Sequence, residues 1–137
     1  MWQSIIRLFQ YARQTAGRIL LALSLVMVTD LSFAANPVPA DDASVASGAQ
    51  LFAQFCTECH GRDGRAQVDV ISDATDLTEP EAYYSGTSED EIFNSISNGA
   101  GVAMPPWSHG QISGPNDLWH LVNFIRSLWT PEQRAAY

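Results

Sequence analysis

The chain has 137 residues, of which 46% are hydrophobic, and 15 acidic residues against seven basic ones give it a formal net charge of −8. It contains no lysine. Such a balance excludes electrostatic binding to nucleic acid or to an anionic membrane, and the length leaves room for one small domain.

Residues 1–34 have the pattern of an export segment. Arginines at positions 7, 13 and 18 precede a nearly unbroken apolar run of 10 residues, Ile19–Val28, and small residues at 32 and 34 suit cleavage after Ala34. The run is shorter than the about 20 apolar residues of a membrane span. We predict a cleavable signal; the alternative is an uncleaved membrane tether. Either way the remainder is exported, and without residues 1–34 it carries four basic and 14 acidic residues, a formal net charge of −10.

Residues 35–42 contain two prolines and no apolar period, which predicts a linker to a domain spanning residues 43–137. A helical spacing of apolar and small residues begins at Ala43 and runs to Phe55, at Val45, Gly48, Ala49, Phe52 and Phe55. Gly48 on this face would let another helix approach closely. Close packing would offset the ~1 kcal/mol that a helical glycine costs against alanine.

The most informative motif is Cys56-Thr57-Glu58-Cys59-His60. C-x-x-C-H is the pattern of haem c attachment, in which two thiols form thioethers with the porphyrin and the adjacent imidazole ligates the iron. Cys56 and Cys59 are the only cysteines of the chain. The motif predicts one covalently bound haem c, with His60 as an axial ligand.

Two other uses of a C-x-x-C pair stay open at this point. A redox-active dithiol of the thioredoxin kind belongs in a βαβ pattern, and the sequence shows no such alternation. A zinc site needs two further ligands, and only His109 and His120 remain among the histidines.

The middle of the chain predicts a turn, an irregular stretch and one helix. Gly61–Arg65 is rich in turn residues, and no regular structure is expected over 68–78. Ser88 followed three residues later by Glu91 predicts a capping box that opens a helix ending at Asn98-Gly99. The acidic cluster at 89–91 then complements the helix dipole and is not expected to form a binding site.

Residues 99–114 are predicted to form a loop that presents Met104. Pro105 and Pro106 keep the chain extended there, and Met104 is the only methionine once residues 1–34 are removed. A thioether on a stiff loop downstream of the histidine suits a sixth iron ligand. The alternative is a methionine that fills a gap in the core.

The last long helix is expected to begin near Ser113 as N-cap, with Pro115 in its first turn. Its apolar residues recur at steps of three and four, at Leu118, Leu121, Val122, Ile125 and Leu128. His120 lies inside this helix and is expected to be hydrogen-bonded or exposed rather than bound to iron. Thr130-Pro131 should end the helix and open a short terminal turn.

Taken together, residues 43–129 resemble the class I cytochromes c. The resemblance rests on Gly48-x-x-x-Phe52, Cys56-x-x-Cys59-His60-Gly61, Ala103-Met104-Pro105-Pro106-Trp107 and the stretch from Leu118 to Leu128. It implies an all-α fold of three to four main helices around one covalent haem, with one haem edge exposed. It also implies helix crossing near Gly48, Phe52, Leu121 and Phe124, with His60 as proximal and Met104 as distal ligand.

One departure from the family pattern concerns the loop after the haem motif. Many relatives have a proline there whose carbonyl accepts the proximal histidine's Nδ1–H, whereas this chain has Thr75. A threonine carbonyl can serve, with less rigid placement. Candidates for binding the haem propionates or supporting Met104 are Tyr83, Tyr84, Trp107, Arg62 and Arg65.

These features predict a periplasmic monohaem cytochrome c that carries single electrons between larger redox partners, from a dehydrogenase or reductase complex to a terminal acceptor. It is not expected to be an enzyme, since no acid, base or nucleophile set is evident. Partners would dock through a basic patch of their own or an apolar surface, and the mature domain would bind no membrane unless the N-terminal segment is retained. Alternatives are a haem subunit of a periplasmic oxidoreductase complex, a weak peroxidase, a thiol oxidoreductase, or a gas sensor with a displaceable Met104.

Overall fold

The computed structural model describes residues 36–67, 74–108 and 110–137, so the predicted export segment lies outside the described residues. Within these ranges the fold is all-α, as predicted, and its only β-type pairing is an isolated bridge between Ala100 and Met104. The elements are α2 (Asp42–Phe55), α3 (Thr57–His60), the 3-10 helix η1 (Pro80–Ala82), α4 (Glu89–Asn98), α5 (Asp117–Ser127) and α6 (Pro131–Ala136).

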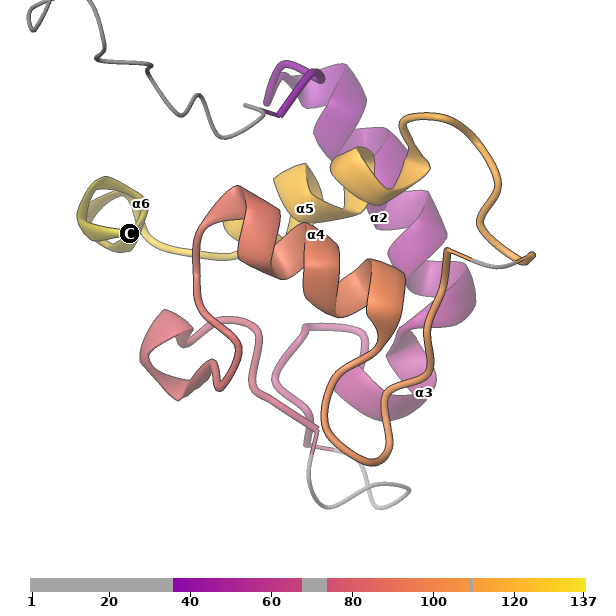
Figure 1. Cartoon of the computed structure of the whole chain (residues 1–137). Helices are drawn as coiled ribbons and strands as arrows, with labels where there is room; N and C mark the ends of the chain where they lie inside the picture. Colours follow the sequence, from indigo (N-terminus) through magenta and orange to yellow (C-terminus); the bar gives the residue numbers. More distant parts are fainter. Residues whose placement is uncertain (1–35, 68–73, 109) are drawn as a thin grey trace, which may run out of the picture. The chain divides into compact units, whose positions relative to one another are not determined.

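Helices α2 and α5 cross in close contact, and Gly48 makes the contact possible (Figure 1). A Cβ atom on Gly48 would lie 2.0 Å from the carbonyl oxygen of His120 and 2.7 Å from Cβ of Phe124. Beside this point the rings of Phe52 and Phe124 pack at 5.0 Å between centroids. The crossing that the family resemblance implied is therefore confirmed.

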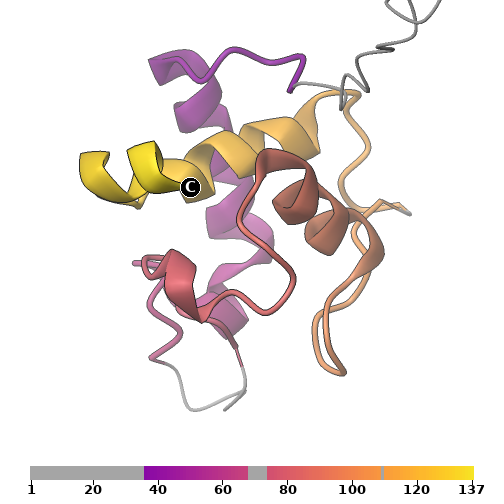
Figure 2. The ribbon, with the colours of Figure 1, turned by 60° about the vertical axis from the view of Figure 1, so that its left-hand side comes forward.

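Helix α4 packs against α5 and closes the core from a second side (Figure 2). The rings of Phe93 and Trp119 stack at 4.2 Å between centroids. The buried core collects apolar residues from α2, α4, α5 and the segments between them, namely Phe52, Leu77, Ile92, Ile96, Ile112, Leu118, Leu121, Val122, Ile125 and Trp129. Helix α5 supplies four of these and is buried on more than one side, as its broad apolar stripe predicted.

The stretch before α2 is fastened to α5 by buried hydrogen bonds. The side-chain amide of Asn123, only 2% exposed, donates to the carbonyls of Val38 and Pro39, each at 3.2 Å, and to Ser44 Oγ at 2.7 Å. Asn36 donates to Oδ1 of Asn123 at 2.8 Å. Part of the stretch expected as a linker thus packs against the core.

Most predicted helix ends are confirmed, and one is wrong. Ser88 opens α4 with the predicted capping box, and Thr130 caps the helix α6 where only a short terminal turn was expected. The long C-terminal helix was expected from Ser113, but α5 begins at Asp117. Residues 114–117 form a turn instead, in which Gly114 N–H donates to the Asp117 carboxylate at 2.8 Å and Asp117 N–H donates to the Gly114 carbonyl at 3.2 Å.

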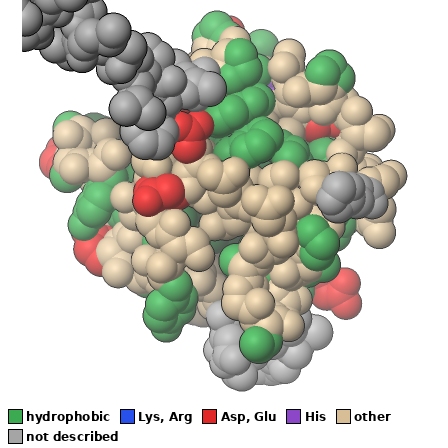
Figure 3. Space-filling view, in the orientation of Figure 1, with side chains coloured by type: hydrophobic (Ala, Val, Ile, Leu, Met, Phe, Trp, Pro, Cys, Tyr) green, Lys and Arg blue, Asp and Glu red, His purple; other side chains and the backbone are tan. Residues whose placement is uncertain are grey.

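The visible surface agrees with the acidic composition. On the face shown in Figure 3 the charged side chains among the coloured residues are acidic and lie between scattered hydrophobic ones. No helix in the described ranges is long and apolar enough to cross a membrane.

Candidate haem-binding site

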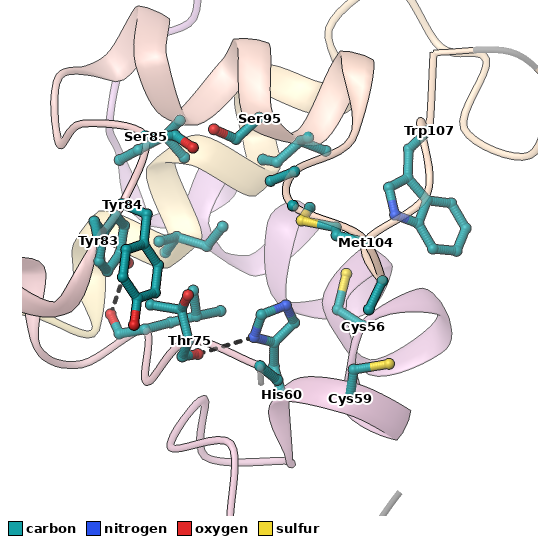
Figure 4. A pocket seen from close by; sticks show the side chains of 18 of the residues that line it. Cys56, Cys59, His60, Thr75, Tyr83, Tyr84, Ser85, Ser95, Met104 and Trp107 are labelled. Carbon is teal, nitrogen blue, oxygen red and sulfur yellow. Dashed lines mark hydrogen bonds between the residues drawn. The ribbon is translucent and has the colours of Figure 1, made fainter. Parts of the chain in front are cut away.

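The four residues expected to hold the haem line one cavity of about 690 Å³. Cys56, Cys59 and His60 come from α3 and the residue before it, and Met104 comes from the loop after α4 (Figure 4). The cavity walls are completed by apolar side chains of the core, namely Phe52, Ile92, Ile96, Leu121 and Ile125. This volume lies within the about 300–1,000 Å³ that is usual for cofactor sites.

A break between α2 and α3 brings the two thiols and the imidazole to the same cavity. Cys56 ends α2 by donating its N–H to the Phe52 carbonyl at 2.9 Å. Its own carbonyl then accepts from the N–H groups of Cys59 at 3.3 Å and His60 at 2.9 Å, which makes one further helical turn. Gly61 ends this turn at a positive φ of 72°, a conformation that glycine adopts without strain.

The ring of His60 is oriented by a backbone carbonyl. Its Nδ1 lies 3.1 Å from the carbonyl oxygen of Thr75, and because a carbonyl can only accept, Nδ1 carries the proton. Burial lowers the pKa of His60, and the hydrogen bond to Thr75 works in the opposite direction. A neutral imidazole with Nε2 unprotonated is the form that binds a metal. The carbonyl of Thr75 therefore orients the imidazole, although no proline stands at this position.

The loop that carries Met104 is tied to α4 by its backbone. Ala100 and Met104 exchange two N–H···O=C bonds of 3.2 and 3.3 Å, and Trp107 N–H donates to the Ile96 carbonyl at 3.1 Å. Gly99, at a positive φ of 81°, passes so close to this loop that a Cβ there would lie 2.6 Å from the Met104 carbonyl oxygen. The thioether is thus presented by a fixed loop rather than by a helix of the core.

The other candidate residues separate into those that line the cavity and those that do not. Tyr83, Tyr84 and Trp107 line it, and Tyr84 is 94% exposed at its edge. Arg62 and Arg65 do not line it. Arg65 forms an exposed ion pair with Asp63 at 3.9 Å. His60 is the only basic side chain among the described residues of the lining.

The chemistry of the cysteines and of His120 disfavours the competing uses, and His109, the other histidine considered as a zinc ligand, lies outside the described residues. Burial and the neighbouring Cys59 raise the pKa of the Cys56 thiol to about 12, whereas a redox-active dithiol depends on a lowered thiol pKa. No group of three or more His, Cys, Asp or Glu side chains suited to a metal ion occurs in the described part of the chain. His120 is engaged elsewhere, with Nδ1 2.9 Å from Ser44 Oγ.

The cavity therefore fits a porphyrin bound through its periphery and its iron. Its walls are mainly apolar, two thiols lie at one edge, and a nitrogen and a thioether sulfur face it from different segments. Sequence reasoning identified the four chemical groups from their motifs. It did not identify the wall residues as part of a site, because their helical spacing has the same form as that of any buried core.

Comparison with known proteins agrees with this assignment. Residues 43–125 match the family model for cytochrome c oxidase, cbb3-type, subunit III. Over 70 residues the chain is 39% identical to the cbb3-type cytochrome c oxidase subunit CcoP of Rhodobacter capsulatus, covering 51% of this chain and 23% of that protein. It is 29% identical over 119 residues to subunit FixP of Azorhizobium caulinodans, covering 82% of this chain and 39% of that protein.

The chain thus spans about a quarter to two fifths of the length of these relatives. A chain of the reducing HAO-like protein complex of Kuenenia stuttgartiensis has a similar fold, with a TM-score of 0.59 at 20% identity over 69% of this chain and 47% of that one. The family match covers more than half of the sequence and includes the C-x-x-C-H motif, the Met104 loop and nearly all of α5. The chain therefore belongs to the cytochrome c oxidase, cbb3-type, subunit III family, a family of c-type cytochromes.

Proposed function

We propose that the chain carries one haem c, attached through Cys56 and Cys59 with His60 and Met104 as axial ligands, and that it passes single electrons between redox proteins outside the cytoplasm. The observation that carries this proposal is the convergence of all four side chains on one cavity. A bound haem c supplies an iron that changes valence by one electron.

The residues of the chain would set the conditions for that exchange. Thr75 holds the proton on Nδ1 of His60, which leaves Nε2 for the metal. Met104 on its fixed loop would hold the iron as a second protein ligand and leave no open position for a substrate, which suits electron transfer. The apolar wall keeps water away from the site.

The first test is visible spectroscopy of the native protein and of Met104→Ala. We expect low-spin iron in the native protein, with a methionine-dependent charge-transfer band in its oxidised form, and loss of that band in the variant. Trp107→Phe is the matched control, because it changes a neighbouring cavity residue without removing the sulfur, and it should retain the band. An unchanged spectrum in Met104→Ala would refute ligation by this residue.

Attachment through the cysteines is tested separately. Pigment of the native protein should survive denaturing, acidified-solvent extraction, and the mass of the matured chain should increase by that of one haem. Cys56→Ser and Cys59→Ser should each lose one of the two thioether links. Complete extraction of pigment from the native protein would contradict covalent attachment.

A second candidate is a haem subunit that works only within a larger oxidoreductase complex. It is favoured by the relatives, which are named as subunits of cbb3-type cytochrome c oxidase. Purification from native membranes or soluble extract distinguishes the two: a free carrier elutes as a small protein, whereas a subunit co-purifies with larger redox chains.

We further propose an exported domain that begins after a signal at residues 1–34. The N-terminal sequence of the isolated protein distinguishes cleavage after Ala34 from a retained tether. With a formal net charge of −10 on the remainder, the domain should meet partners through a basic or an apolar patch on their side. A basic partner would give electron-transfer rates that fall with rising salt, and an apolar one would not.

A further inference from the structure

We propose that Trp129 and Tyr83 are positioning residues for His60, acting through the backbone of Leu77 and the Thr75 carbonyl. The inference rests on the proposed role of His60 as an iron ligand. It concerns what holds the Thr75 carbonyl in place when no proline is present there.

Leu77, two residues after Thr75, has every backbone hydrogen-bonding group engaged. Its N–H donates to the Gly64 carbonyl at 2.7 Å. Its carbonyl accepts from Tyr83 Oη at 2.9 Å and from Trp129 Nε1 at 3.0 Å. The Leu77 side chain is 8% exposed and belongs to the core. Leu77 is thereby fixed at three hydrogen bonds and one buried side chain.

The residues on either side of Leu77 are held as well. The Asp76 carboxylate accepts from Thr78 N–H at 2.9 Å and from Thr78 Oγ1 at 2.6 Å, which forms a tight local turn. Gly64, the partner of Leu77, lies in the turn after His60, where Ala66 N–H donates to the His60 carbonyl at 2.9 Å. The Leu77–Gly64 bond therefore links the backbone after His60 to the segment that carries Thr75.

The two donors come from rigid surroundings. Trp129 follows α5, is 2% exposed, and has the guanidinium of Arg126 over its ring at 4.9 Å from the centroid. Tyr83 follows η1, and its ring meets that of Trp129 edge to face at 5.7 Å. Burial raises the pKa of Tyr83, so its hydroxyl remains a donor throughout the physiological range. Both side chains donate to the Leu77 carbonyl, one from the residues that follow α5 and the other from the residue that follows η1.

Trp129 separates a positioning effect from a direct one. Tyr83 lines the cavity, but Trp129 does not, so Trp129 acts on the site only through its neighbours, by its hydrogen bond to Leu77 and its contact with the ring of Tyr83. A hydrogen bond from Nδ1–H to a carbonyl raises the basicity of a ligating imidazole and favours the more highly charged metal. Weakening the placement of Thr75 should therefore favour reduced iron.

The experiment measures the reduction potential of Trp129→Phe and Tyr83→Phe in the haem-loaded protein. Each variant removes one donor and keeps a ring. We expect the ratio of reduced to oxidised protein at a fixed ambient potential to rise by about threefold to tenfold, the upper end being 59 mV for one electron. NMR of the reduced protein should show faster solvent exchange of the His60 Nδ1 proton in both variants.

Two control variants identify effects of lost stability alone. Val122→Ala leaves a gap in the core at a residue that does not line the cavity. Tyr137→Phe removes a surface hydrogen bond to Glu81 at 3.2 Å. Neither should change the potential or the exchange of the Nδ1 proton. If Trp129→Phe does not fold, Tyr83→Phe decides through the same two measurements.

The proposal is overturned if a coloured, folded Trp129→Phe keeps the native potential and native proton exchange, or if Val122→Ala changes both as much. Failure of the proposed function has a different signature, because a chain that binds no haem is colourless in every variant.

Discussion

At the scale of single residues, Gly48 determines how closely the two main helices approach. The carbonyl of His120 occupies the space that any side chain at position 48 would need. Because that neighbour is backbone rather than a flexible side chain, it cannot rotate away. The sequence already indicated this role. A glycine destabilises a helix by about 1 kcal/mol relative to alanine, so a glycine in the middle of an apolar face suggests that a neighbouring helix comes too close for a side chain.

Gly48→Ala should therefore destabilise the fold although alanine is the better helix former. We expect a loss of about 1–3 kcal/mol in the free energy of unfolding, because α2 and α5 must move apart. Ala46→Ser adds one atom at an exposed position of the same helix and should change it by less than about 0.5 kcal/mol. Denaturant unfolding of the loaded protein measures both. Equal stability of Gly48→Ala and the native protein would contradict the close crossing.

At the scale of elements, α4 depends on its N-terminal capping box. Ser88 Oγ accepts from Glu91 N–H at 3.3 Å, and the Glu91 carboxylate accepts from Ser88 N–H at 3.0 Å. Ser88→Ala should lower the free energy of unfolding by about 1 kcal/mol, since one N-terminal donor loses its partner. Ser47→Ala, which removes a hydroxyl bonded within α2, is the matched control and should change it by less than about 0.5 kcal/mol. A Ser88→Ala protein as stable as the control would contradict the role of the cap.

The same capping box makes the stability of α4 depend on pH in the acidic range. Hydrogen bonds from the Ser88 side chain and backbone hold the pKa of Glu91 below its ordinary value of 4.5. A carboxyl whose pKa is depressed in the folded state stabilises the fold above its unfolded pKa. This contribution is lost as the pH falls from about 4.5 through the folded-state pKa. NMR titration should show the lowered pKa in the native protein and a value closer to 4.5 in Ser88→Ala.

The sequence predicted interactions between residues that are close in the chain and missed those between residues that are far apart. The cap at Ser88 was predicted because its partner Glu91 lies three residues away, whereas at Thr130 only a short turn was expected. The start of α5 was misjudged because a turn at 114–117 competes locally with a helix that Pro115 would also permit. The bonds of Asn123 to Val38 and of Trp129 to Leu77 span 85 and 52 residues, and no local pattern indicates such pairs.

The site follows the same rule. The motif C-x-x-C-H predicted Cys56, Cys59 and His60 because haem attachment needs those chemical groups at that spacing, and Met104 was predicted from its place on a proline-stiffened loop. The replacement of the usual proline by Thr75 was visible in the sequence, but the two hydrogen bonds from Tyr83 and Trp129 to the Leu77 carbonyl were not. They need two aromatic side chains to meet one carbonyl, and only folding brings these residues together.

At the scale of the whole molecule, the cofactor should be part of the core. The cavity shares its wall with the buried cluster, through Phe52, Ile92 and Leu121 among others. Without the haem, water would contact the apolar side chains of this wall, and their burial, worth about 25 cal/mol per Å² of apolar surface, would no longer stabilise the fold. The entire stability of an ordinary domain is only about 5–15 kcal/mol, so a loss over a cavity of this size would be a large part of it.

The haem-free chain should therefore lack a stable tertiary structure. A Cys56→Ser/Cys59→Ser double variant, freed of pigment, should lose its near-ultraviolet circular dichroism and bind a hydrophobic dye, while some helical signal remains. The same variant with haem retained non-covalently is the control and should keep the near-ultraviolet signal. A pigment-free variant that unfolds cooperatively with native-like stability would contradict this prediction.

The hydrogen bonds between Asn123 and the residues Asn36 and Val38 limit how far the domain can be shortened from its N-terminal side. The family match starts at residue 43, but a recombinant version cut there would discard both carbonyl acceptors and the donor from Asn36. The Asn123 amide would keep only Ser44 Oγ as an acceptor, and leaving its other buried hydrogen-bonding groups without these partners costs about 1–3 kcal/mol. The shortest recombinant fragment that keeps the native melting temperature should therefore begin no later than Asn36, two residues past the expected signal cut.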